Sequence, residues 1–371
     1  MKIAYLFNSS IPSNNASSLQ VVKMCGALSE LGHKVLLITP NTGIKNKSIK
    51  SFYGSKKDFK RIKMNYFNKF PLGINYYLFS LFSILKVLDK KIDLFLTRNF
   101  FTCFLLVLFR KKTVIEVHHD LNIESRIVRL IFKFLNILNS KSIIKIIAIT
   151  KNVKKMLINS YHVQSNKIEI LPSSSDIKIK YNQLNKFNKN FFKIGYFGSL
   201  DKTKGVEFII ELSKYDKKNK YYVFGDKIEK VNQLKKTYSH KNLDINPYIQ
   251  PSKLKDYLNK MDICLMPYNR KLIKSSGGVG NISKYTSPLK LFDYMACGKI
   301  ILSSKVNVLL DILKHNYNSI LIDRLDVKVW KKEIDKLLKN KKKCQKISKN
   351  VLLISKQNTY YNRAKKLLIG I

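Results

Sequence analysis

The sequence predicts an α/β protein with two domains, each built on a doubly wound parallel sheet. The chain opens with an apolar run of strand length at 3–7, a polar loop at 8–18, apolar residues at helical spacing, and a second strand at 35–39. A strand and tight turn at 193–200 open a second succession of the same kind. The length of 371 residues also suits two domains.

The polar loop at 8–18 is the first candidate site segment. Ligands of a doubly wound sheet bind beyond the carboxyl ends of its strands, and this loop follows the first strand. We therefore expect it to face a ligand cleft. The loop is rich in serine and asparagine and lacks glycine, and its candidate cleft residues are Asn14, Asn15 and Ser17.

Two further predicted strands, within 92–99 and 114–120, end in polar tips. The second tip carries His118 and, next to it, His119. A histidine near a strand end can act at a site, but a single histidine in such a place is more often structural. The residues alone therefore leave both roles open for His118.

Residues 125–139 predict a helix that allows two interpretations. Arg126, Arg129 and Lys133 share one face, while isoleucine, leucine and phenylalanine crowd the others. Such a helix can lie on an anionic membrane, or it can be a core helix with one solvated stripe. The lysine-rich stretch 45–69 predicts a solvated loop or face, with anionic lipid as its alternative partner.

The second half of the chain begins after a polar stretch at 177–191, which predicts a linker. Lys204 starts the helix that follows the strand and turn at 193–200, and by itself it fits one surface lysine among many. The segment 271–284 contains three glycines and predicts a mobile loop.

A short helix is predicted between Ser287 and Gly298. Ser287 suits its N-cap, Pro288 its first helical position, and Gly298 the residue after its carboxyl end. Lys290 lies in the first turn, where a positive charge opposes the helix dipole. A bound anion would remove this conflict, since free N–H groups and the lysine would both point at it. The alternative is a solvated lysine at a loop–helix junction.

The run from Thr286 to Lys299, TSPLKLFDYMACGK, resembles the signature of the retaining nucleotide-sugar glycosyltransferases of GT-B fold, glycosyltransferase family four or glycosyl transferases group 1. That signature pairs two acids with seven residues between them. Asp293 takes the second position, and Tyr285 takes the first. Other segments that match the family are the Glu116-x-His118 tip, 167–176, Gly198–Gly205, 261–267 and Tyr360–Leu368.

The resemblance implies two facing Rossmann-like domains with a cleft between them. The first would be an acceptor-side domain over residues 1–180, followed by a linker at 181–191. The second would be a donor-binding domain over 192–355. Residues 356–371 would form a helix that crosses back to the first domain.

The resemblance also implies roles for site residues. His118 would contact the donor sugar, Lys204 and Lys290 would neutralise the leaving diphosphate, and Asp293 would hold the donor ribose. The full expected donor set is Gly198, Ser199, Lys204, Tyr285, Ser287, Leu289, Lys290 and Asp293. The loop with Asn14, Asn15 and Ser17 would lie near the acceptor. No metal and no cofactor would be needed, because the nucleotide-diphosphate-sugar is a co-substrate.

The net charge of +46 comes from 70 Lys and Arg against 24 Asp and Glu. It points either to nucleic acid or to the anionic inner face of a membrane. A genome biased toward A and T also explains much of the excess, because Lys, Asn, Ile, Phe and Tyr are abundant together. No C2H2 spacing or aromatic RNP motif is present, so we expect no nucleic acid and favour the membrane surface.

The cysteines and the apolar runs give expectations about the cellular compartment of the protein. Five scattered cysteines with no metal-ligand spacing predict a reduced chain. The amino terminus has no cleavage pattern, and the apolar run 100–109 is too short to span a bilayer. We therefore expect a cytoplasmic protein, with peripheral attachment to the inner membrane face as a candidate.

Three rival functions differ in what they would do with a nucleotide-sugar. A GT-B epimerase would convert the donor without a separate acceptor. A non-catalytic module of the same fold would bind the donor and turn nothing over. A basic nucleic-acid binder would show strongly salt-dependent affinity.

Overall fold

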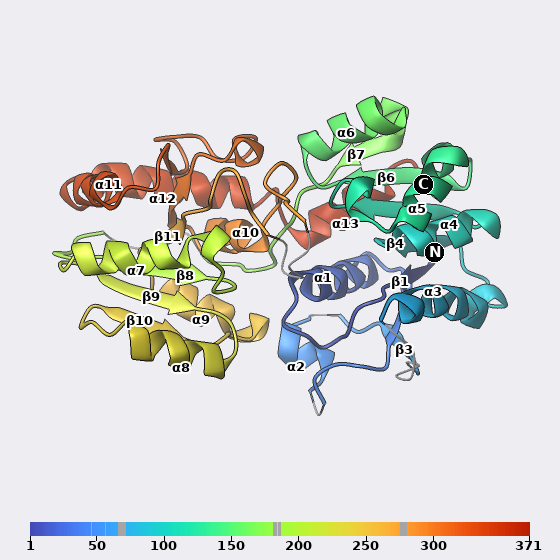
Figure 1. Ribbon diagram of the computed structural model, residues 1–371, viewed down its shortest axis with the longest axis horizontal. Coiled ribbons are helices and arrows are strands. Elements are labelled where there is room, and N and C mark those ends of the chain that lie inside the picture. The colour runs from blue at the N-terminus through green and yellow to red at the C-terminus, as the bar shows by residue number, and fades with distance from the viewer. Residues whose placement is uncertain (46, 56, 66–71, 181–183, 185–186, 275–279) are drawn as a thin grey trace. The chain divides into compact units, whose positions relative to one another are not determined.

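A parallel sheet organises each of the two units into which this computed structural model divides (Figure 1). The structure describes residues 1–371 except 46, 56, 66–71, 181–183, 185–186 and 275–279. The first unit contains residues 1–173 and 360–371, and the second contains 174–359. Parts of the predicted linker at 181–191 and of the predicted loop at 271–284 lie outside the described residues.

The sheet of the first unit has the order β3-β2-β1-β4-β5-β6-β7, and all described pairs are parallel. Its strands are β1 (Lys2–Leu6), β2 (Lys34–Pro40), β3 (Lys60–Met64), β4 (Leu94–Thr97), β5 (Thr113–Val117), β6 (Ile143–Ala148) and β7 (Ile168–Ile170). Strands β1 to β3 are added toward one edge of the sheet and β4 to β7 toward the other, so the strand order reverses between β1 and β4. In doubly wound folds, ligands bind at the carboxyl ends of the strands beside such a switch point.

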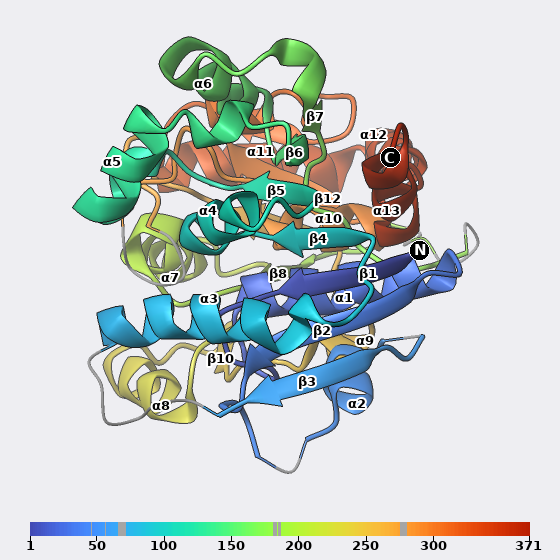
Figure 2. The same cartoon turned by 90° about the vertical axis from the view of Figure 1, so that its right-hand side faces the viewer.

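Helices complete the first unit. They are α1 (Ala16–Glu30), α2 (Ile49–Tyr53), α3 (Leu72–Leu88), α4 (Phe100–Leu108), α5 (Arg126–Phe134), α6 (Lys151–Tyr161) and α13 (Tyr360–Leu368). Figure 2 shows α3 and α4 over the near face of the sheet, where their apolar residues pack on β1, β2 and β4. Helix α13 comes from the end of the chain, packs against α1, and accepts a hydrogen bond from Lys145 on β6 at the Leu367 carbonyl, 3.0 Å.

The second unit repeats the plan, with a parallel sheet of order β10-β9-β8-β11-β12-β13. Its strands are β8 (Lys193–Phe197), β9 (Lys220–Phe224), β10 (Leu243–Asn246), β11 (Ile263–Met266), β12 (Ile300–Ser304) and β13 (Ile320–Ile322). Its helices are α7 (Val206–Tyr215), α8 (Ile228–Thr237), α9 (Leu254–Asn259), α10 (Leu289–Ala296), α11 (Val327–Lys339) and α12 (Lys341–Ser355). Separate apolar clusters cover the two faces of this sheet, one around Trp330 and the other around Phe292.

The prediction of two doubly wound α/β domains is confirmed, and three local predictions need correction. The stretch 45–69 is not only a solvated loop, because it contains α2 and the edge strand β3. The predicted helix at 125–139 is α5 followed by a separate turn of 3₁₀ helix at Ile137–Asn139. Helix α10 begins at Leu289 with Pro288 at its N-cap position, so Ser287 does not cap it.

Across the described part of the chain, none of the helices combines the length and the apolar character needed to cross a bilayer.

Candidate functional site

Lys290 is a buried lysine of the second unit. It lies in the first turn of α10, whose N-cap Pro288 offers no side-chain hydrogen bond. Its Nζ is buried and has no hydrogen-bond partner among the described residues. The ammonium lies 3.9 Å from the centre of the Tyr196 ring and 5.4 Å from that of Tyr268. Burial, together with the charge of Lys204, holds the pKa of Lys290 well below that of an ordinary lysine.

Gly198 forms one wall beside this ammonium. It follows β8 with a φ of +154°, a conformation that glycine adopts without strain. A Cβ at this position would lie 2.7 Å from the Lys290 Nζ and 2.9 Å from its Cε. Because Gly198 has no side chain, its backbone lies close to the buried Lys290 ammonium. A polar ligand could therefore contact the Gly198 backbone and the ammonium together.

Lys204 supplies a second cation next to Lys290. It ends the 3₁₀ turn Lys202–Lys204, which Asp201 caps by accepting from the Thr203 N–H, 2.8 Å. Its Nζ donates to the Ser199 Oγ, 2.6 Å away. Burial lowers the pKa of Lys204, and Asp201 offsets part of that effect. The structure thus brings Gly198, Ser199, Lys204 and Lys290, four of the predicted donor residues, close together, and an anion with several oxygens could accept hydrogen bonds from both lysines.

Asp293 lies one turn further along α10. Its Oδ1 accepts a hydrogen bond from the Ser175 Oγ, 2.7 Å. Leu289 is the first residue of the helix, and Ser287 and Tyr285 belong to the segment that leads into it. The predicted donor residues therefore lie in the segment that follows the carboxyl end of β8, or on α10 and the segment that leads into it. Ser175 was not among the predicted site residues, although it lies in the segment 167–176 that matches the family.

A buried ionic cluster centres on Glu116 in the first unit. Its Oε1 accepts from the Gln20 amide, 2.7 Å, and lies 2.5 Å from the His118 Nε2. Its Oε2 accepts from the Arg363 guanidinium, 2.8 Å, and Arg98 Nε lies 3.7 Å from Oε1. Burial by itself raises the pKa of the Glu116 carboxyl, but Arg363, His118 and Arg98 together hold it well below the ordinary value.

The ionised carboxylate of Glu116 fixes the state of His118. Burial lowers the pKa of His118 to about 4, with Arg98 adding to the effect, so the ring is neutral at pH 7. An ionised carboxylate can only accept hydrogen bonds, so the proton of the ring must lie on Nε2. The Nδ1 atom is then an acceptor at the end of β5.

The predicted cleft loop reaches the same cluster through Arg98. The Arg98 guanidinium donates to the Ser17 carbonyl, 3.3 Å, so it joins the amino end of α1 to Glu116. Ser13, in the same loop, is tied by its backbone to the Tyr53 hydroxyl, 2.7 and 2.9 Å. Asn14 and Asn15 are exposed, and Asn15 occupies the N-cap of α1 without a side-chain capping bond.

His119 is held apart from this cluster. Its Nε2 lies 2.8 Å from Glu124 and its ring packs against Phe100. The sequence analysis singled out His118 but not Gln20, Arg98 or Arg363, which the structure places around Glu116. A signal for Arg363 existed, because it is the arginine of the predicted terminal helix, whose matched residues Tyr360, Arg363, Ala364 and Leu367 are all buried.

Comparison with known proteins adds the family. The family model described as Glycosyltransferase Family 4 matches residues 18–178, and the model described as Glycosyl transferases group 1 matches 178–352. An uncharacterised glycosyltransferase of Methanocaldococcus jannaschii is 26% identical in an alignment of 258 positions that covers 62% of this chain and 60% of that protein. The chain therefore spans three fifths of the length of that relative.

Solved structures share the fold at low identity. HepE of Anabaena, crystallised with UDP and glucose, superposes with a TM-score of 0.71 at 14% identity and covers 100% of both chains. A putative UDP-N-acetylglucosamine 2-epimerase of Listeria monocytogenes superposes with a TM-score of 0.65 at 11% identity, covering 99% of this chain and 94% of that one. At these identities the likeness establishes the fold alone.

Two Rossmann-like parallel-sheet domains and a cationic strand-end site in the second one define a protein of GT-B fold. The two family models together extend from residue 18 to residue 352. The chain belongs to glycosyltransferase family four, the glycosyl transferases group 1.

Proposed function

We propose that the protein transfers a sugar from a nucleotide-diphosphate-sugar to a glycan or lipid-linked acceptor, with retention of anomeric configuration and without a metal ion. The observation that carries this proposal is the buried ammonium of Lys290 beside Lys204 and Gly198, which has no hydrogen-bond partner among the residues that the structure describes. Two cations and a helix amino end can stabilise the charge that develops on a leaving diphosphate. Family membership and the UDP held by HepE support a nucleoside diphosphate as that group.

Each remaining residue of the site has a proposed task. Asp293 binds the ribose hydroxyls, with Ser175 fixing one of its oxygens. His118 contacts the donor sugar through Nδ1, since its Nε2 is held by Glu116. The leaving phosphate itself takes the acceptor proton, so no side chain is assigned as a base. Cell-surface polysaccharide or glycolipid synthesis is the setting that suits such a product.

Nucleotide binding without a divalent ion tests the donor site. We expect UDP or another nucleoside diphosphate to bind in EDTA, because Lys204 and Lys290 supply the positive charge that a metal ion supplies elsewhere. Isothermal titration calorimetry with UDP, GDP, ADP and CMP, each in EDTA and in Mg²⁺, measures this directly. Loss of all binding on chelation would contradict the metal-free site.

His118→Ala should reduce turnover roughly a hundredfold and leave the affinity for nucleoside diphosphate nearly unchanged, because the ring would act on the sugar and not on the nucleotide. The matched control is His119→Ala, which removes an equally bonded histidine from the next position. A wild-type rate for His118→Ala, or a fall in melting temperature large enough to explain the lost rate, would remove His118 from the reaction.

The epimerase alternative rests on the fold that this chain shares with the putative Listeria epimerase. It predicts that donor incubated alone yields an isomeric nucleotide-sugar. Transfer predicts that donor alone is stable apart from slow hydrolysis and that sugar moves when acceptor is added. A non-catalytic module would bind the donor and give neither product, so one chromatographic assay separates all three functions.

A further inference from the structure

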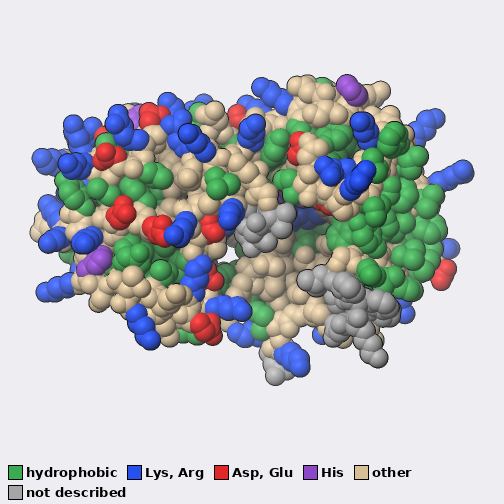
Figure 3. All heavy atoms as spheres, in the orientation of Figure 1, with side chains coloured by type: hydrophobic (Ala, Val, Ile, Leu, Met, Phe, Trp, Pro, Cys, Tyr) green, Lys and Arg blue, Asp and Glu red, His purple; other side chains and the backbone are tan. Residues whose placement is uncertain are grey.

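Three helices of the first unit carry a concentration of exposed apolar side chains. Exposed fractions range from 38% for Phe82 to 74% for Phe134. The members are Ile74, Phe82 and Leu85 on α3, Leu108 on α4, Ile127, Leu130 and Phe134 on α5, and Leu135 directly after it. We call these eight residues the apolar face. Figure 3 shows apolar atoms gathered over this side of the first unit.

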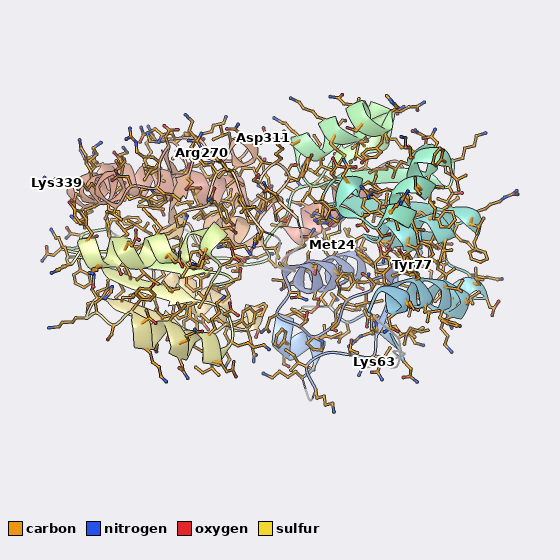
Figure 4. All side chains as sticks on the ribbon, in the orientation of Figure 1. Met24, Lys63, Tyr77, Arg270, Asp311 and Lys339 are labelled. Carbon is orange, nitrogen blue, oxygen red and sulfur yellow. The ribbon has the colours of Figure 1, made fainter. Side chains whose placement is uncertain are left out.

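The helices that carry the apolar face are fastened to one another. Tyr77 on α3, labelled in Figure 4, packs its ring edge-on against Phe101 of α4 at 4.6 Å. Its hydroxyl lies 2.8 Å from the Oγ of Ser125, the N-cap of α5. Phe132 of α5 points inward and packs on Phe100 of α4. Helix α5 is therefore anchored by one side while its other side is exposed, which makes the three helices one continuous surface.

The charges on these helices all have one sign. Residues 72–88, 100–108 and 126–134 contain no Asp or Glu. Their cations are Lys86 on α3 and Arg126, Arg129 and Lys133 on α5, and all four are exposed. Contiguous apolar patches of this kind mark interaction sites, and basic residues beside exposed apolar side chains are typical of surfaces that bind anionic lipid.

We propose that the apolar face docks on an anionic lipid bilayer, with Phe134, Leu135, Ile127 and Leu130 inserted among the acyl chains at the headgroup boundary. Arg126, Arg129 and Lys133 then contact lipid phosphates, since long basic side chains keep their charges at the interface while their stems lie on apolar surface. Charge complementarity selects this occupant. A second copy of the chain would set the same four cations against one another, with no acid on these helices to offset them.

The docking surface lies beside the polar cluster of the same unit. Asn99 caps α4 and directly follows Arg98, and its Oδ1 accepts from the Tyr76 hydroxyl of α3, 2.6 Å. The segment from His118 leads to α5 through residues 119–125. If the proposed transferase function holds, the acceptor is then lipid-linked, because a bilayer bound to α3–α5 places a lipid headgroup near the strand ends that carry Arg98 and His118. Bilayer binding itself does not depend on that function.

Vesicle flotation with the full-length protein tests the proposal. The probes are vesicles of phosphatidylcholine alone and vesicles in which roughly a third of the lipid is anionic phosphatidylglycerol, because an anionic surface attracts basic side chains. We expect binding to the anionic vesicles alone. Phe134→Ser/Leu135→Ser should reduce the partition coefficient about tenfold or more, and Arg126→Gln/Arg129→Gln/Lys133→Gln roughly a hundredfold. The matched controls are Leu353→Ser on α12 and Lys339→Gln/Lys341→Gln/Lys342→Gln, all exposed in the second unit.

UDP binding by calorimetry and the melting temperature are measured on every variant. They separate a loss of lipid binding from a loss of folding or of the proposed nucleotide site. Loss of vesicle binding in the α5 variants, with UDP affinity and melting temperature unchanged, supports the docking surface. Equal loss in the second-unit controls would overturn it, because general positive charge would then explain the binding. A dimer in light scattering that the Phe134→Ser/Leu135→Ser variant abolishes, without vesicle binding by the wild type, would assign the apolar face to a second copy instead.

Discussion

Lys290→Met should make the protein more stable and weaken the binding of UDP at the proposed donor site. The buried ammonium has no hydrogen-bond partner among the described residues, so removing it should raise the free energy of unfolding by roughly 1–3 kcal/mol. The same change removes a charged donor from the proposed diphosphate site and should weaken UDP binding roughly a hundredfold. Chemical denaturation and calorimetry measure the two effects on one protein sample.

Lys299→Met is the matched control for Lys290→Met. Lys299 is also a buried lysine of the second unit, but its Nζ donates to the Met261 carbonyl, 2.9 Å, and to the Asn259 carbonyl, 3.3 Å. Its replacement should lower stability and leave UDP affinity unchanged. If both variants behaved alike, the lack of a hydrogen-bond partner for Lys290 among the described residues would have no bearing on nucleotide binding.

The pH dependence of the Lys290→Met effect has a definite sign. Because the folded-state pKa of Lys290 is lowered, the unfolded chain binds more protons at this residue below the ordinary lysine pKa of about 10.4. Wild-type stability therefore rises with pH through that window, while the variant lacks the contribution. The stability gap between the two should be largest near neutral pH and should close as pH approaches 10.4.

The sequence singled out those residues of the candidate donor site that lie within one contiguous run. A lysine in the first turn of a short helix opposes the dipole, and that local conflict is visible without a structure. The strand and tight turn at 193–200 were also predicted from a contiguous run, while the resemblance to the family supplied the site role of Gly198–Gly205. Ser175 was not singled out as a site residue, because it reaches Asp293 across 118 positions of chain, and no local pattern encodes such a contact.

The basic edge strand β3 shows a second limit. Its residues Lys60–Met64 alternate little and carry three cations, a composition that predicts a solvated segment. Edge strands tolerate such residues because one side pairs with a neighbour, here β2, while charge on the strand discourages pairing with another chain. Helix α5 mixes cations with apolar residues and was open to two interpretations. In the structure Val128 and Phe132 are buried while Ile127, Leu130 and Phe134 are exposed, so only some of its apolar residues belong to the core.

Arg363→Met should lower the free energy of unfolding by about 3–5 kcal/mol, because it leaves the buried Glu116 carboxylate without its closest cation. Arg363 also donates to the Pro172 carbonyl, 2.9 Å, and to the Leu171 carbonyl, 3.1 Å. It therefore joins α13 to the two residues that directly follow β7. Chemical denaturation followed by circular dichroism measures the loss. A change below about 1 kcal/mol would mean that the pair contributes no more than an exposed salt bridge.

The double variant Glu116→Gln/Arg363→Met separates charge from packing. Replacing both members of a buried pair by neutral groups often changes stability little, so the double variant should regain most of the stability lost in Arg363→Met.

The stability lost in the single variant Arg363→Met should also depend on pH. In the wild type the lowered pKa of Glu116 gives stability that is present above the ordinary glutamate pKa of about 4.3 and is lost as pH falls below it. In Arg363→Met burial instead favours the protonated carboxyl, so the penalty should be small near pH 4 and should grow toward pH 7. Glu116 also holds the Nε2 of His118, so turnover should fall in Arg363→Met even at a temperature where the variant stays folded. A normal rate at that temperature would show that His118 keeps its position without the ion pair.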